Sequence, residues 1–443
     1  MNRVRPSDEN AWYWSYDDDP ILLLGGTDKD NLFQWTGDQL RDHLDQLVEA
    51  GGNFVRNTMS DRKDEDVSPF ERTDDGTYDL QRWNVEYWNR LSAFLDETAQ
   101  RDIVVELTLW DQHDFAGSRW ADHAWNPINN ETLPEDALPA SGGDHWQDRI
   151  AFFRTVEEDN DVVLAQQERY VEKILDHTLE YGNVIYNVTN EGWAGIEWEL
   201  HWAERVLDRA AEQGVHVEVA NMNMEPEDSV RKVIEHPETF SYVEVSQHNQ
   251  HFAGASGQDH WDNLQQWRGD VEDAIGPRPF NNVKIYGGFG GEIDAAGEAD
   301  EAVEWYWRNV FGGCAACRFH RQVAGGDEGW GIGGSDRALT HIRSVRMVEE
   351  HLDLPRLRPR QDLLVDAGPN EAFCIAAPGE SYGVYLPGGG EVTLALEAGD
   401  YECRYLDAEA AAWTERDPIE NATEQTFTAP DRKNQVIVIT ATS

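Results

Sequence analysis

Two hydrophobic patterns alternate along residues 1–355 of the chain. Short runs of β-branched and aromatic residues, typical of buried strands, are each followed by a stretch with apolar residues three and four positions apart. The second pattern predicts an amphipathic helix, so the chain is expected to form repeated strand–helix units. The expected strands cover residues 21–25, 53–57, 103–110, 184–190, 215–220, 242–246, 283–286 and 314–319. The expected helices cover residues 36–50, 80–100, 162–181, 197–213, 228–235, 262–272, 298–310 and 337–352.

Eight strand–helix units predict an α/β fold in which the strands close into a (β/α)8 TIM barrel over residues 1–355. From residue 356 the pattern changes to short alternating runs punctuated by Gly and Pro, at residues 373–376, 381–386, 392–396, 401–405 and 435–439. Such runs are typical of a small antiparallel sandwich. We therefore expect a C-terminal antiparallel β-sandwich domain over residues 356–443 that packs against the barrel.

The connection after the third expected strand is unusually long. Residues 111–160 are irregular in pattern and rich in aromatic residues and histidine. Loops of this length in a compact domain are most often lids or cleft walls. We expect the segment to close part of a pocket, although any one of its side chains, such as His123, is more often a packing residue.

The net charge of the chain limits the kinds of molecule that it is expected to bind. There are 85 Asp and Glu against 36 Lys and Arg, a formal net charge of −49, and the acids are spread along the sequence. Periodic segments and abundant aromatics argue against disorder. Such a folded acidic chain is typical of proteins that stay soluble in molar salt, as in a halophilic archaeon, where the Debye length shrinks to about 3 Å. Binding to nucleic acid or an anionic membrane is not expected, because no basic stripe is present.

Cysteine and hydrophobicity patterns favour a cytoplasmic protein. Four cysteines are too few for a disulfide scaffold, and Cys314 and Cys317 lack a second pair at zinc-site spacing, so we expect them to face the core. No run approaches the roughly 20 apolar residues that span a bilayer, and no export signal follows Met1. Most of the 18 tryptophans are expected in the core, and a few suit a sugar cleft because an indole stacks on a pyranose. No cofactor is expected.

Charged and amide side chains follow three of the expected strands. Arg56 ends the second strand, Asn190 and Glu191 end the fourth, and Glu292 follows the seventh in a glycine-rich segment. In a closed barrel these strand ends share one mouth, so Glu191 and Glu292 are expected to face each other. Two facing carboxyl groups suit glycoside hydrolysis, in which one protonates the leaving oxygen and the other attacks the anomeric carbon.

These motifs carry a family resemblance. Residues 52–56, 70–107, 186–191 and 287–292 together resemble the clan of retaining glycoside hydrolases built on TIM barrels. Residues 381–396 resemble the collagen-binding-type β domain that follows such barrels in glycosidase-like bacterial and archaeal proteins. The resemblance implies an enzyme that cleaves an oligosaccharide or glycoside by double displacement, with its acid/base after strand four and its nucleophile after strand seven.

The resemblance also assigns roles to individual residues. Glu191 becomes the acid/base and Glu292 the nucleophile, with carboxyl groups about 5 to 5.5 Å apart. Asn190 is then the partner of the sugar hydroxyl beside the anomeric carbon, and Arg56 orients the nucleophile. Further substrate contacts are expected from Trp110, His113, His248 and Trp330.

Three positions depart from the pattern of the clan. Gly192 replaces the Pro that commonly follows Asn-Glu, and Gln250 stands where a Tyr follows strand six. The aromatic residue that usually ends strand eight has no clear equivalent, because His320 stands at the strand end and Trp330 lies beyond it. The change at Gln250 leaves the orientation of the nucleophile open.

The sequence leaves two alternatives to a retaining glycosidase. Asp111, His113, His248 and His320 are conceivable ligands of a metal-dependent barrel hydrolase, although the first strand lacks the expected histidine pair. The change at Gln250 keeps open a barrel that binds glycans without cleaving them, or a structural barrel protein.

Overall fold

In the computed structural model of the protein, the chain forms two compact units. The first unit comprises residues 1–5, 30–44 and 55–244, and the second comprises residues 6–29, 45–54 and 245–443. The structure describes the chain except for residues 1–2, 17–18, 64, 116–117, 140–150, 193, 251–256, 289–295, 323–328, 368–370 and 443, and the side chains of residues 118, 415–416 and 421–422.

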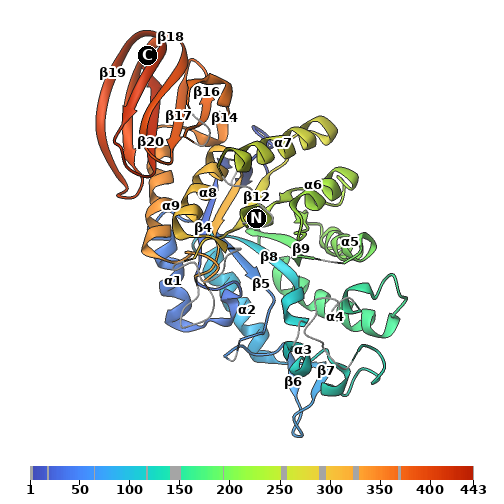
Figure 1. Cartoon of the computed structure of the whole chain (residues 1–443). Helices are drawn as coiled ribbons and strands as arrows, with labels where there is room; N and C mark the ends of the chain where they lie inside the picture. The colour runs from blue at the N-terminus through green and yellow to red at the C-terminus, as the bar shows by residue number, and fades with distance from the viewer. Residues whose placement is uncertain are drawn as a thin grey trace. The chain divides into compact units, whose positions relative to one another are not determined.

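The first unit contains a four-stranded sheet in the order β10–β9–β8–β5. Every residue of β8 and β9 is buried, which matches their nearly continuous apolar runs. The parallel register sets Asp111 opposite Asn190, so the carboxyl ends of β8 and β9 lie side by side (Figure 1). The strands are β5 (Phe54–Thr58), β8 (Val104–Asp111), β9 (Val184–Asn190) and β10 (Val219–Ala220), of which β8, β9 and β10 run parallel.

Two of the helices in this unit begin at asparagine caps. Asn84 and Asn160 accept backbone hydrogen bonds from Glu86 and Val163, which fixes the starts of α2 and α4. Helix α2 packs on β8, and α5 packs on β9. The helices are α1 (Gly37–Glu49), α2 (Val85–Ala99), α4 (Asp161–Thr178), α5 (Ile196–Glu212) and α6 (Pro226–Glu235).

Several predicted boundaries in this unit are wrong. Residues 80–83, expected to open a helix, belong to a hairpin of β6 (Phe70–Arg72) and β7 (Tyr78–Trp83), in which Phe70 pairs with Trp83. The strands expected at residues 215–220 and 242–246 shrink to the two-residue β10 and β11 (Val243–Glu244). In its described residues, the long connection after β8 contains short turns, which are η2 (Gln112–Phe115), α3 (Ser118–Asp122), η3 (Pro127–Asn129) and η5 (Phe152–Arg154).

The second unit contains three parallel strands, paired in the order β12 (Phe280–Ile285), β13 (Ala316–Phe319) and β4 (Leu23–Gly26). Its helices are α7 (Gly257–Ile275), α8 (Ala299–Phe311) and α9 (Asp336–Glu349), and short strands β1 (Arg5–Pro6), β2 (Trp14–Tyr16) and β3 (Asp19–Ile21) precede β4. Cys314 and Cys317 are buried free thiols, as expected. Parallel strands separated by helices confirm the α/β class, while closure of eight strands into one barrel stays a prediction.

The C-terminal residues form one antiparallel sheet of seven strands, in which β18 and β19 are long neighbouring strands (Figure 1). The runs expected as separate strands at residues 392–396 and 401–405 are a single strand, β18. Strand β19 escaped prediction because most of its described side chains are exposed and polar. A two-layer sandwich stays a prediction. The strands are β14 (Arg358–Pro359), β15 (Leu364–Asp366), β16 (Phe373–Ala377), β17 (Ser381–Leu386), β18 (Gly390–Asp407), β19 (Ala412–Ala429) and β20 (Gln435–Ala441).

The two faces of this sheet bury different partners. Alternate residues, among them Val384 and Ile437, form one apolar cluster within the C-terminal strands. On the other face Tyr385 stacks on Trp307 of α8, with ring centroids 5.5 Å apart. The sheet therefore packs directly on the helices of the second unit.

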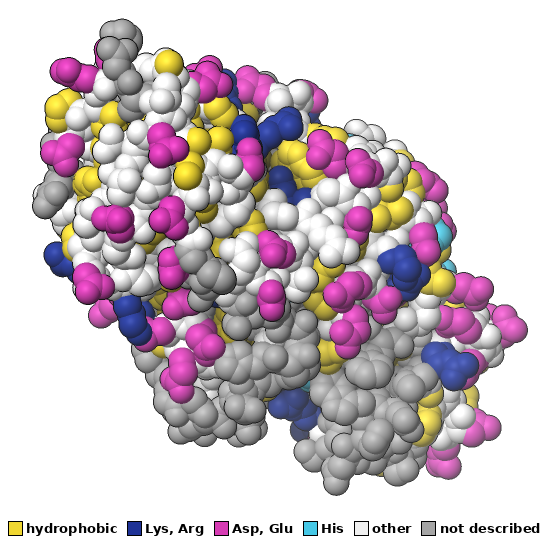
Figure 2. All heavy atoms as spheres, turned by 45° about the horizontal axis from the view of Figure 1, so that its top comes forward, with side chains coloured by type: hydrophobic (Ala, Val, Ile, Leu, Met, Phe, Trp, Pro, Cys, Tyr) yellow, Lys and Arg dark blue, Asp and Glu magenta, His cyan; other side chains and the backbone are white. Residues whose placement is uncertain are grey.

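On the face drawn in Figure 2, acidic side chains are scattered over the described residues, with fewer Lys and Arg among them. This distribution agrees with the net charge of −49. Solubility in molar salt stays a prediction. Within the described ranges, no helix is long and apolar enough to cross a membrane.

Candidate active site

Glu191 follows β9 directly and has an unusual backbone. Its φ is +53°, in the left-handed region that costs a residue with a Cβ about 1–2 kcal/mol. Only 6% of its surface is exposed. Strained residues persist only where the surrounding structure imposes the conformation, and they cluster at functional sites. The conformation of Glu191 therefore supports a role beyond ending a strand.

Gly192 helps to impose this conformation. Its N–H donates to the carbonyl of Met222 at 2.9 Å, a bond that proline is unable to make. A Cβ at this position would lie 2.2 Å from Oγ1 of Thr189, so larger residues have no room. The replacement of the usual Pro by Gly thus has a physical reason in this chain.

A buried polar cluster supports the Gly192 turn. The Nδ2 amide of Asn223 lies 3.4 Å from the Gly192 carbonyl and 3.1 Å from Oε1 of Glu199. Glu199 pairs with Lys232, and both side chains are almost completely buried. Burial raises the pKa of the Glu199 carboxyl, while Lys232 and Asn223 partly offset that effect.

His113 is a side-chain partner of Glu191. Its Nε2 lies 2.7 Å from Oε2 of Glu191. His113 belongs to the turn after β8, where its backbone N–H donates to Oδ1 of Asp111 at 3.0 Å. The side chain is 26% exposed, so solvent reaches the edge of this pair. The structure thereby brings two residues predicted for the site into contact.

The amide of Asn190 is held at both ends. Arg56 Nη2 donates to its Oδ1 at 2.9 Å, and its Nδ2 donates to Oδ1 of Asp111 at 2.9 Å. Arg56 is completely buried and lies 3.7 Å from a carboxylate oxygen of Asp30. Arg56 thus orients Asn190, and its expected action on the nucleophile stays a prediction.

Asp111 connects this site to a second acidic group. Arg62 donates to Oδ2 of Asp111 at 2.7 Å and lies 3.7 Å from Oδ1 of Asp114. Burial alone would raise the pKa of Asp111, but Arg62, His113 and Asn190 together lower it below its ordinary value. Sequence reasoning missed Arg62 and Asp114, because both lie in irregular segments and the only signal was their position after strands.

Trp110 of β8 is buried and packs on Trp202, with ring centroids 5.4 Å apart, and its predicted contact with substrate stays a prediction. The other predicted residues belong to the second unit. Glu292 lies outside the described residues, so its role and its separation from Glu191 stay predictions. Trp330 is half-buried and packs on Tyr286, with ring centroids 5.6 Å apart. His320 packs on the same ring at 4.8 Å. Gln250 is buried, and its side-chain amide contacts Gln247.

His248 has the surroundings of a core residue. It is completely buried, stacks on His260 with centroids 4.0 Å apart, and its Nε2 lies 2.8 Å from the His260 carbonyl. Burial is the main reason that the pKa of His248 falls to about 4, which keeps the ring neutral. Its predicted contact with substrate stays a prediction.

No group of three or more metal-binding side chains occurs within the described part of the chain. Three of the four conceivable ligands named above have other partners: Asp111 binds Arg62, His113 binds Glu191, and His248 binds a backbone carbonyl.

Comparison with known proteins places the fold among glycoside hydrolases. A family described as "Domain of unknown function (DUF6298)" matches residues 69–261. No curated protein sequence is similar to the chain. Among solved structures, a protein described as a glycoside hydrolase has a TM-score of 0.68 and 12% identity, covering 99% of this chain and 97% of its own.

Two further solved structures belong to glycoside hydrolase family 5. One from Bacteroides vulgatus has a TM-score of 0.68 and 12% identity, covering 99% of this chain and 93% of its own. A mutant of a mannosidase from Rhizomucor miehei has a TM-score of 0.56 and 12% identity, and the match covers 78% of this chain and 97% of the mannosidase chain. At such identities the likeness establishes a shared fold. The chain is thus similar in fold to family 5 glycoside hydrolases.

Proposed function

We propose that the protein is a retaining glycoside hydrolase in which Glu191 is the acid/base and Glu292 the nucleophile. The observation that carries the proposal is the strained, buried Glu191 at the end of β9, held 2.7 Å from His113 and next to a fixed Asn190. The fold similarity to family 5 enzymes supports it.

The geometry suits the two tasks of an acid/base. Glu191 first gives its proton to the leaving oxygen and later takes a proton from water. His113 helps to keep the carboxyl group in one orientation through the contact of its Nε2 with Oε2. The Glu191 side chain is only 8% exposed, so most of it is withdrawn from bulk water.

Asn190 is suited to hold the sugar hydroxyl beside the anomeric carbon. Arg56 and Asp111 fix which end of the amide carries oxygen and which carries nitrogen. One N–H of Nδ2 is used by Asp111, so the second is left to donate to the sugar. A preorganised donor of this kind lowers the reorganisation needed in the transition state.

The test compares wild type, Glu191→Gln, Glu292→Gln and the surface control Glu197→Gln on para-nitrophenyl and dinitrophenyl glycosides in molar salt. Loss of a general acid costs about 10²–10⁴-fold. Glu191→Gln should lose that much on para-nitrophenyl substrates and less on dinitrophenyl substrates, whose leaving group needs no proton. Glu292→Gln should lose activity on both, and Glu197→Gln on neither.

Product stereochemistry tests the retaining mechanism separately. Proton NMR of the first product is expected to show the anomeric configuration of the substrate. Inversion would refute double displacement, and activity unaffected by both glutamine variants would refute the assigned site. Sugar binding without turnover by wild type would favour the alternative of a non-catalytic carbohydrate-binding barrel.

A further inference from the structure

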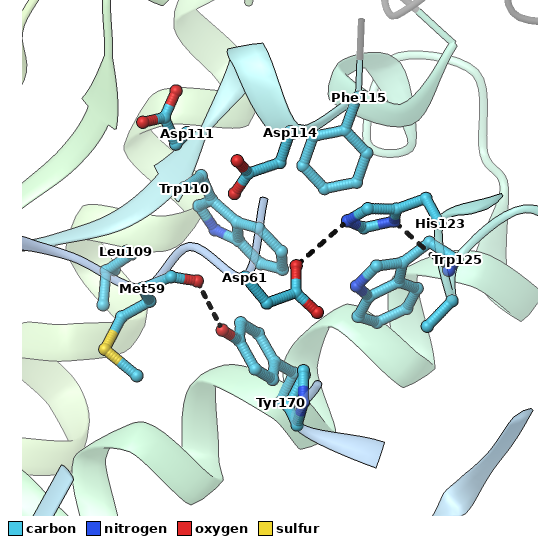
Figure 3. Close-up of a pocket in the computed structure, with 12 residues that line it drawn as sticks. Met59, Asp61, Leu109, Trp110, Asp111, Asp114, Phe115, His123, Trp125 and Tyr170 are labelled. Carbon is cyan, nitrogen blue, oxygen red and sulfur yellow. Dashed lines mark hydrogen bonds and ion pairs between the residues drawn. The ribbon is translucent and has the colours of Figure 1, made fainter. Parts of the chain in front are cut away.

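A small chamber lies beside the candidate active site in the first unit (Figure 3). It is lined by aromatic rings and carboxyl groups contributed by β8, by the loop after β5, by the long connection after β8 and by α4. The part of its volume that the centre of a water-sized molecule can occupy is about 20 Å³. By this measure one water needs about 10–15 Å³, so the chamber holds one or two water-sized groups and no sugar ring. The lining includes Asp61, Trp110, Asp111, Asp114, His123 and Ala124.

One residue of the lining carries a buried donor that is not used. Trp110 is 2% exposed, and its Nε1–H has no hydrogen-bond partner among the described residues. Its indole lies between the carboxyl groups of Asp61 and Asp114 in Figure 3. An unsatisfied buried donor is unfavourable, so an oxygen atom that reached this N–H would be stabilised there.

A second donor comes from His123. Its Nδ1 accepts the backbone N–H of Trp125 at 3.3 Å, which places the ring hydrogen on Nε2. That nitrogen lies 3.7 Å from Oδ1 of Asp61. Burial lowers the pKa of His123 to about 3, so the ring is neutral at ordinary pH. His123 therefore presents a single N–H at the edge of the chamber.

The carboxyl groups supply acceptors and, when protonated, further donors. Burial raises the pKa of Asp61 to about 6. Burial also raises the pKa of Asp114 well above its ordinary value, although Arg62 partly offsets the effect. A chamber with both donors and acceptors suits a neutral hydroxyl group, which can donate and accept at once.

The chamber and the candidate active site share a wall. Asp111 lines the chamber and also accepts hydrogen bonds from Asn190 Nδ2 and the His113 backbone. A sugar bound beside Asn190 and Glu191 therefore lies against the residue that bounds the chamber. The aromatic rings of Trp110, Phe115 and Trp125 offer apolar walls for a CH2 group.

We propose that this chamber receives the exocyclic hydroxymethyl group of the sugar bound beside Glu191, so that it selects hexosides over pentosides. The inference depends on the proposed glycosidase function. A hydroxymethyl group contributes one carbon and one oxygen, which matches the space available, and its hydroxyl can pair with Trp110 Nε1 and Asp61.

The test uses matched substrates that differ only in this group. They are para-nitrophenyl β-D-glucopyranoside with the β-D-xylopyranoside, and para-nitrophenyl β-D-galactopyranoside with the α-L-arabinopyranoside. Wild type should favour the hexoside in each pair that it cleaves. Trp110→Phe removes the N–H and keeps an aromatic ring, and it should lower the ratio of hexoside to pentoside kcat/KM about two- to tenfold. Ala124→Val fills the chamber and should lower the ratio as well.

Trp202→Phe is the matched control. Trp202 also carries a buried Nε1–H without a partner among the described residues, and it packs 5.4 Å from Trp110 but does not line the chamber. Its variant should leave the ratio unchanged. Equal ratios in wild type, Trp110→Phe and Ala124→Val would overturn the proposal, and so would an equal change in Trp202→Phe.

A binding measurement separates the failure of this inference from that of the proposed function. If wild type cleaves no aryl glycoside, the proposed function fails. Calorimetric titration with D-glucose and D-xylose then tests the chamber by itself. Tighter binding of glucose, weakened by Ala124→Val, is the expected result, whereas equal binding or no binding of either sugar would refute the chamber as a hydroxymethyl site.

Discussion

Replacing Glu191 by alanine and by glycine separates the strain at this residue from its chemistry. Both variants remove the carboxyl group and its contact with His113, and they differ only in the Cβ atom. At a φ of +53° a Cβ costs about 1–2 kcal/mol. Glycine loses about 0.5–1 kcal/mol through the greater freedom of its unfolded chain. The glycine variant should therefore be the more stable of the two by about 0.5–1 kcal/mol.

The same pair of substitutions at Glu204 gives the control. Glu204 is exposed in the middle of α5, where glycine is about 1 kcal/mol less favourable than alanine. The two positions should thus give differences of opposite sign. Urea unfolding in molar salt, with a slope of about 1–3 kcal/mol per M, should show midpoints about 0.2 to 1 M apart at Glu191.

A glycine variant at Glu191 that is less stable than the alanine variant, as is expected at Glu204, would refute this reasoning. Activity provides a second readout, because both Glu191 variants should be nearly inactive on para-nitrophenyl glycosides. A glycine variant that is more stable and inactive would show that the chain holds Glu191 in a strained conformation for function.

Three other variants test the surroundings of the site and the C-terminal strands. Gly192→Ala places a Cβ 2.2 Å from Oγ1 of Thr189 and should cost about 1–3 kcal/mol in urea unfolding. Adding Thr189→Ala should recover part of that loss. If the effects of the two substitutions on the free energy of unfolding simply add, there is no clash between the new Cβ and Thr189. Glu199→Gln leaves the buried Lys232 ammonium without its anion and should cost about 3–5 kcal/mol, whereas Glu199→Leu combined with Lys232→Met should retain most of the stability. The exposed Arg231–Glu235 pair provides a comparison, because breaking it should cost little stability. If Glu199→Gln costs no more than Glu235→Gln, the Glu199–Lys232 pair is not buried as described. For Glu409, burial alone would raise the pKa, but His341 and Arg337 lower it below its ordinary value. The folded pKa lies below the unfolded one, so the stabilisation is full above the unfolded pKa of about 4.3 and is lost as pH falls. The Tm advantage of wild type over Glu409→Gln should therefore shrink on acidification, and a constant advantage would refute the assignment.

Local patterns in the sequence determined which segments are buried and how they are folded. The apolar runs of β8 and β9 and the periodic faces of most helices need no tertiary information, because burial and backbone geometry impose their own periods on side chains. The position of Glu191 after a buried strand was equally visible. Patterns failed where an element lacks an apolar face, as in the exposed, polar strand β19, and where polar strand residues precede a helix, as in β7.

Only the tertiary structure decided which side chains meet. Asn190 and Asp111 are neighbours because of the register between β8 and β9, and residues 112–183 separate these strands along the chain. The left-handed backbone of Glu191 depends on the Gly192 contact with Met222, which no local pattern reports. The chamber likewise brings Asp61, Trp110 and His123 together from three segments. Sequence periodicity specifies burial, whereas register and loop path set the distances on which the proposed chemistry depends.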